Sequence, residues 1–119
     1  MPAPIARDTH TKSVTIALNG NLSDAIDMRP YTMATVHMPA TWTAASIGFK
    51  VSTSKGGTYL PLYDDDGNLV QIDSPTASKA FTVPAALCAG HFVKLWSQDG
   101  SASNTAQAAA RTLVLDLKS

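Results

Sequence analysis

Short segments in which apolar and polar residues alternate recur along the whole chain. The segment Ser46–Ser52 places Ile47, Phe49 and Val51 on one side, and Arg111–Leu117 does the same with three leucines. A period of two puts alternate side chains on opposite faces of a β-strand, so each segment predicts a strand with one buried face. The chain also contains thirteen threonines and no glutamate. This composition disfavours helix, because threonine is a poor helix former and glutamate a good one.

About eight such segments follow one another, separated by glycine, proline, asparagine and aspartate. The expected strands lie at 13–18, 33–38, 46–52, 59–63, 69–73, 78–83, 91–97 and 111–117. Short strands joined by turns are typical of an antiparallel sandwich or a jelly roll. A parallel sheet needs crossover helices, for which no segment has the length or the period. We therefore expect an all-β fold, a single antiparallel β-sandwich or jelly-roll-like domain spanning residues 13–119.

Three stretches leave their local structure open. Residues 23–27 begin with a helix-capping serine, and residues 106–110 are rich in alanine, so each is a candidate for one or two helical turns. Residues 85–90 fit either a single helical turn or a loop. Residues 1–12 show no period of either kind, and we expect them to form a flexible N-terminal arm. The arm is either a tether that becomes ordered on a partner or a frayed terminus.

Charge and hydropathy exclude several classes of protein. Nine lysines and arginines balance nine aspartates, so the chain lacks the basic stripe that nucleic-acid binding requires. Its 45% hydrophobic content is too high for a disordered chain. No apolar run is long enough to span a membrane, and no apolar stretch typical of a secretory signal follows Met1. We expect a protein made in the cytoplasm, with neither nucleic acid nor a membrane as a partner.

The residues that carry catalysis in other proteins form no recognisable pattern in this sequence. His10, His37 and His91 lie in different segments, and Cys88, the single cysteine, sits in an apolar run without a disulfide partner. The sequence contains no Gly-x-Ser-x-Gly elbow and no phosphate-binding glycine loop. We expect the protein not to be an enzyme and to use no cofactor and no metal.

An acidic cluster at residues 64–66 precedes Gly67 and Asn68. One interpretation is a calcium site, but calcium takes six to eight oxygens and adjacent side chains in one turn supply only two or three. The other is a hairpin turn in which aspartate carboxylates accept hydrogen bonds from backbone amides, since Asp-Gly and Gly-Asn favour such turns. The second interpretation is favoured.

Two tryptophans suggest a binding function as the alternative. Trp42 lies in a loop just before a predicted strand, where it either stacks on a sugar ring or caps the core. Trp96 alternates with core residues, which favours packing within the domain. The alternative function is a carbohydrate- or host-surface-binding module of a tail or head fibre.

Four segments of the sequence resemble small virion proteins of tailed bacteriophages, of the head decoration or cement type. They are residues 21–27, 38–52, 56–68 and 107–115, and the resemblance extends over residues 13–117. It implies a β-sandwich on the capsid surface of the virion that binds and stabilises the assembled head. The implied partners are the major capsid protein or another virion protein and further copies of the chain, with a homotrimer as the expected oligomer.

The arm, the turns and the loops supply the candidate partner contacts, because such segments are usually exposed. The candidates are Pro2, Pro4, Arg7, Trp42, Asp64, Asp66, Asn104 and Gln107.

Overall fold

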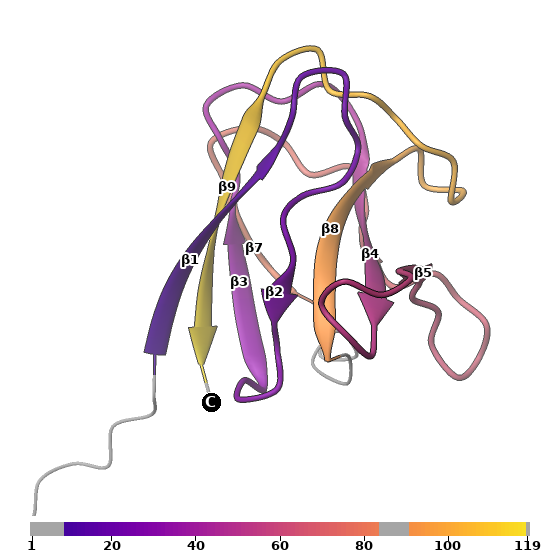
Figure 1. The fold of residues 1–119 in the computed structure, drawn as a ribbon. Coiled ribbons are helices and arrows are strands. Elements are labelled where there is room, and N and C mark those ends of the chain that lie inside the picture. The colour runs from indigo at the N-terminus through magenta and orange to yellow at the C-terminus, as the bar shows by residue number, and fades with distance from the viewer. Residues whose placement is uncertain (1–8, 84–90, 119) are drawn as a thin grey trace, which may run out of the picture.

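The computed structural model describes residues 9–83 and 91–118 (Figure 1). The strands are β1 (Thr9–Ile16), β2 (Ile26–Asp27), β3 (Met33–His37), β4 (Ser46–Ser52), β5 (Leu60–Pro61), β6 (Gln71–Ile72), β7 (Ala80–Thr82), β8 (Phe92–Gln98) and β9 (Arg111–Lys118). One sheet has the order β1-β9-β3-β7, and the other has the order β2-β8-β4-β5 with β6 also paired to β4. We call them sheet A and sheet B. The described residues contain no helix, hence none that could cross a membrane, and the expected all-β sandwich is confirmed.

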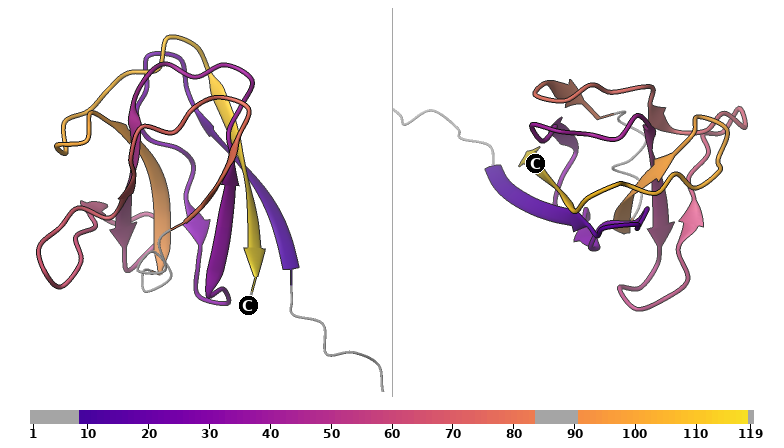
Figure 2. Two further views of the ribbon diagram at one scale, coloured as in Figure 1. Left: turned by 180° about the vertical axis from the view of Figure 1, so that it is seen from behind. Right: turned by 90° about the horizontal axis from the view of Figure 1, so that it is seen from above.

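The pairing of the strands identifies a jelly roll. Strand β1 pairs with β9, β2 with β8, β3 with β7, and β4 with β6 and β5, all antiparallel. The first half of the chain therefore pairs with the second half in reverse order, like one long hairpin. Pairing of β9 with β3 and of β8 with β4 then rolls this hairpin into two sheets (Figures 1 and 2). A hairpin rolled in this way is the jelly-roll arrangement.

The core lies between the sheets and follows the period of two seen in the sequence. On β9 the three leucines at 113, 115 and 117 are buried, and on β4 and β8 the pairs Ile47/Phe49 and Val93/Leu95 are buried. Each fully buried aliphatic side chain contributes roughly 1.5–3 kcal/mol relative to exposure. The core therefore holds both sheets together through side chains that the alternation predicted.

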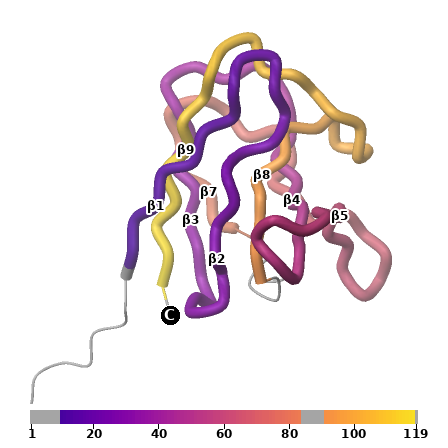
Figure 3. Tube along the Cα trace, viewed as in Figure 1, coloured from indigo at the N-terminus to yellow at the C-terminus, as the bar shows by residue number. Residues whose placement is uncertain are grey.

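Several local expectations need correction. Strand β1 begins at Thr9, so residues 9–12, expected in the arm, pair with β9 opposite residues 115–118 (Figure 3). The physical reason is that backbone hydrogen bonds to a neighbouring strand do not depend on the side chains, so polar residues can extend a strand although they show no apolar alternation. Residues 23–27 and 106–110 form no helix, and Ile26–Asp27 is strand β2. Residues 1–8, which include Pro2, Pro4 and Arg7, and residues 84–90, which include Cys88, lie outside the described residues.

Candidate functional site

The acidic cluster forms the tight turn between β5 and β6. The Asp64 carboxylate Oδ1 accepts hydrogen bonds from the backbone amides of Asp66 and Asn68, each at 2.9 Å. Gly67 has a φ of 82°, a left-handed conformation that glycine adopts without strain. These contacts confirm the hairpin-turn interpretation. The side chains of Asp65 and Asp66 are exposed, and one carboxylate oxygen from each of the three aspartates lies within 4.8 Å of the others.

Gln107 lies inside the domain and not on its surface. Its side chain is 0% exposed. Its Nε2 donates to the Thr43 carbonyl at 3.2 Å and to Ser97 Oγ at 2.9 Å. Its Oε1 accepts from the Thr43 amide at 3.0 Å and from Arg111 Nε at 3.2 Å. The expectation that Gln107 contacts a partner does not hold for its side chain, because all of its polar atoms are used within the chain.

Asn104 is exposed, but its side chain also has a partner within the domain. Its Oδ1 accepts a hydrogen bond from Trp96 Nε1 at 2.8 Å. Trp96 lies on the outer side of sheet B and is only 2% exposed. The Lys50 ammonium lies over the Trp96 ring, 4.6 Å from its centre. The ring of Trp96 is thus packed, as expected, but on the face of β8 opposite the core residues Val93 and Leu95.

Trp42 is half-buried and packs against the core cluster. Its indole Nε1 donates to the carbonyl of Ala45 at 3.2 Å, which fixes the ring over the end of the sandwich. Of the two alternatives for this residue, the structure shows the core cap.

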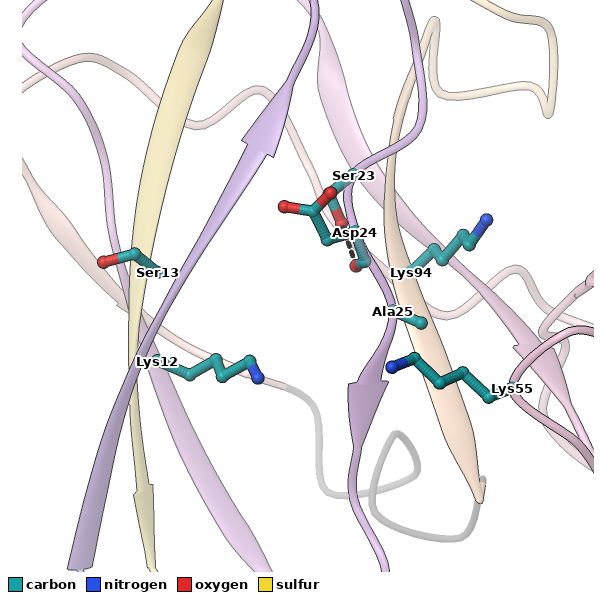
Figure 4. Close-up of a pocket in the computed structure, with 7 residues that line it drawn as sticks. All are labelled: Lys12, Ser13, Ser23, Asp24, Ala25, Lys55 and Lys94. Carbon is teal, nitrogen blue, oxygen red and sulfur yellow. Dashed lines mark hydrogen bonds between the residues drawn. The ribbon is translucent and has the colours of Figure 1, made fainter.

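A basic hollow that the sequence did not indicate lies around the segment 23–25 that leads into β2, between β1 on one side and the turn after β4 on the other (Figure 4). It has a volume of about 540 Å³ and is lined by Lys12, Ser13, Ser23, Asp24, Ala25, Lys55 and Lys94. Lys12 comes from β1, Lys55 from the turn after β4, and Lys94 from β8. Only the rolled hairpin brings these three lysines to one place, so no spacing in the sequence reveals the hollow.

Tyr59 links two of the lysines of this basic hollow. The Lys94 ammonium lies over the Tyr59 ring, 4.6 Å from its centre. The Tyr59 hydroxyl donates to the backbone carbonyl of Lys55 at 2.7 Å. A tyrosine hydroxyl is protonated at neutral pH and can donate, and burial raises the pKa of Tyr59 further above its ordinary value. Tyr59 therefore holds the turn that carries Lys55 next to β8.

Among the described residues, the one ion pair joins Arg29 and Asp27, with Nη2 and Oδ2 2.7 Å apart. Hydrogen bonds from the Arg29 side chain and backbone lower the pKa of Asp27 from 3.8 to about 2. Lys12, Lys55 and Lys94 have no carboxylate at ion-pair distance in this part of the chain. Ammonium and hydroxyl groups donate hydrogen bonds, so the chemistry of the basic hollow suits an anionic group.

The described residues contain one group of three or more acids, histidines or cysteines close enough to share a metal, the turn at 64–66. His10, His37 and His91 do not come together into such a group. His10 instead stacks on Tyr31, with ring centres 6.3 Å apart.

The comparisons with known proteins give one structural likeness. No protein-family model matches the chain, and no curated protein matches its sequence. Among solved structures, the crystal structure of the SPBc2 prophage-derived protein YomS superimposes with a TM-score of 0.58. The match covers 98% of this chain and 100% of that chain at 11% sequence identity. The chain therefore has the same fold as a prophage-derived protein, over the whole length of both.

Proposed function

We propose that this protein is a non-enzymatic bacteriophage structural protein, a decoration or cement subunit that binds and stabilises the assembled head. The observation that carries the proposal is the full-length likeness in fold to the prophage-derived protein YomS. The jelly roll adds support, because it is a recurrent architecture of viral capsid domains. The proposed location is the capsid surface, with the major capsid protein or another virion protein as partner.

The physical basis of cementing is preferential binding to the assembled shell. A subunit that binds the assembled state and not the dissociated one stabilises it by about 2.7 kcal/mol per site at a hundredfold excess over Kd. The nine basic and nine acidic side chains balance each other. A protein without net charge is only weakly attracted to nucleic acid in a nonspecific way, which suits a subunit that has to bind the capsid surface.

The carbohydrate-binding alternative depended on tryptophan rings that face solvent. Trp42 caps the core, and Trp96 is covered by Lys50 and bonded to Asn104. A sugar ring needs an uncovered aromatic face for stacking, so the side chains that motivated this alternative favour a structural role for both tryptophans.

The direct test uses heads that were assembled without this protein. Purified protein is added at increasing concentration, and binding is measured by cosedimentation with the heads. We expect saturable binding at a fixed ratio to the capsid protein, and heads that lose their DNA at a higher temperature once they are saturated. Tails and host cell envelopes serve as controls. Binding to either of these and not to heads would contradict the proposal.

A second experiment tests the arm without disturbing β1. Residues 1–8 are deleted, because a deletion through Lys12 would also remove the four residues of β1 that pair with residues 115–118. If the arm tethers the subunit to the shell, the deletion weakens binding to heads while the thermal unfolding of the free protein stays the same. Equal binding by the shortened and full chains would exclude the arm as a contact.

A further inference from the structure

Two lysines of the basic hollow point into one gap from opposite sides. In Figure 4, Lys12 extends from β1 and Lys55 from the facing turn, with their ammonium groups turned toward each other. The one acid in the lining is Asp24, whose carboxylate accepts a hydrogen bond from the Thr15 amide at 3.2 Å. The third lysine of the lining, Lys94, turns its ammonium away from this gap and onto the Tyr59 ring. Two ammonium groups that face the gap against one aspartate leave the hollow positively charged.

The outer side of sheet B adds positive charge next to this hollow. Lys50 on β4 and Lys94 on β8 are directly opposite each other in the antiparallel pairing. Like charges in such a pair are destabilising. Each ammonium is turned onto an aromatic ring, and neither forms an ion pair within the described residues. An external carboxylate would relieve this repulsion, so the surface is suited to an acidic partner.

The chain itself carries an acidic group of matching size. The turn at 64–68 contains three aspartates, and the connection between β5 and β6 extends away from the sheets (Figure 1). Asp64 is committed to the backbone of its own turn. Asp65 and Asp66 are exposed and form no ion pair in the described structure, so their carboxylates are available to another molecule.

We infer that the basic hollow binds the turn at 64–68 of a second copy of this chain. The turn presents carboxylates on a projecting hairpin, and the hollow presents ammonium groups in an open space of about 540 Å³. The two surfaces differ, so the contact is head-to-tail, and contacts of this kind close into a ring when the rotation between copies permits. The inference deepens the homo-oligomer of the proposed function, on which it rests for its biological setting.

The test is sedimentation velocity of the full chain over a range of concentrations. One variant carries Lys12→Asp and Lys55→Asp, and a second carries Asp65→Lys and Asp66→Lys. Asp64 and Lys94 stay unchanged, because they hold the local structure. A third variant, with Lys79→Asp and Lys118→Asp, makes the same change in charge at exposed positions outside the hollow. Thermal unfolding of each variant confirms that it is folded.

We expect the wild type to associate in about 0.1 M salt and to dissociate in about 1 M salt, since the Debye length falls from roughly 10 Å to 3 Å. Each of the first two variants alone associates at least about tenfold more weakly, because hollow and turn then carry the same sign. Mixing the two restores association through hollows and turns of opposite charge. The third variant retains association.

A wild type that stays monomeric at every concentration overturns the inference, as do variants that associate as strongly as the wild type. A monomeric wild type whose Lys12→Asp, Lys55→Asp variant no longer binds heads would assign the hollow to a capsid protein instead. Association that follows the expected pattern in a protein that binds no heads would leave the inference standing and refute the proposed function. The two can therefore fail separately.

Discussion

Gln107 lies in a polar loop, yet its side chain is fully buried and both of its polar atoms form hydrogen bonds within the domain. It joins the loop around Thr43, strand β8 at Ser97 and strand β9 at Arg111. Buried polar groups that lose their partners cost about 1–3 kcal/mol each. Gln107 therefore ties the loop before β9 to the end of the sandwich.

We predict that Gln107→Ala lowers the free energy of unfolding by about 2–4 kcal/mol, because the amide and the carbonyl of Thr43 both lose their hydrogen-bond partner. The Ser97 hydroxyl keeps its hydrogen bond to the Thr105 carbonyl at 2.7 Å. Urea unfolding at neutral pH measures the change. The control is Asp65→Asn, an exposed substitution expected to stay within about 0.5 kcal/mol of the wild type. A Gln107→Ala protein as stable as this control would show that water replaces the lost bonds.

The ion pair of Asp27 and Arg29 gives a prediction for acid pH. The pKa of Asp27 in the folded chain, about 2, lies below the ordinary 3.8, mainly because Arg29 donates hydrogen bonds to the carboxylate. The stabilisation is therefore present above pH 4 and is lost as the pH falls through about 2. Carboxyl chemical shifts in an NMR titration report this pKa directly. We expect Arg29→Gln to return the value toward 3.8, and an unchanged titration would contradict the assignment.

The strands whose pattern is long and regular could be predicted from the sequence. Residues 46–52 form β4 with Ile47 and Phe49 buried and Val51 partly buried against the core. The last strand follows its three leucines. Strands β5 and β6 lie within the expected strands at 59–63 and 69–73, although each has only two residues. Strand β2 was missed, because two residues carry no period of their own and the neighbouring strand defines them. The basic hollow could not be predicted either, because its lining residues come from separate segments that only the pairing of the strands brings together. Nothing in the local sequence distinguishes the buried Gln107 from the exposed residues around it.

Gly48 on strand β4 has no side chain and so leaves room for Trp96 on the neighbouring strand β8. Gly48 pairs with Trp96, and a Cβ at this position would lie 2.9 Å from Cε3 of the indole and 3.2 Å from Cγ of Gln98. Both neighbours are buried and hydrogen-bonded, so neither moves freely. Glycine at position 48 is thus a requirement of sheet B and not a flexible point.

We predict that Gly48→Ala destabilises the protein by about 1–3 kcal/mol, the usual cost of overpacking. The matched control is Gly56→Ala, since a Cβ there meets nothing within 4 Å. Thermal unfolding compares the two variants. Equal melting temperatures would mean that the indole shifts without cost.

At the level of the whole molecule, β9 holds sheet A together. It lies between β1 and β3 and pairs with both along most of their length. We predict that a chain ending before Arg111 does not fold, because β1 and β3 then lose their shared neighbour and the core loses three leucines. Amide dispersion in NMR spectra tests this. A chain ending at Leu117 is the control and should fold, whereas dispersed spectra from the shorter chain would refute the prediction.

The central place of β9 in sheet A also has a consequence for synthesis. A ribosome adds about 5–20 residues per second from the N-terminus, and many proteins begin to fold as their first elements emerge. Here β1 and β3 are synthesised early, but β9, the strand with which both pair, is synthesised last of the nine strands that the structure describes. Sheet A therefore cannot form on a nascent chain that has not yet released β9. An interrupted translation product lacks the complete sheet, so only chains synthesised through β9 can yield folded protein.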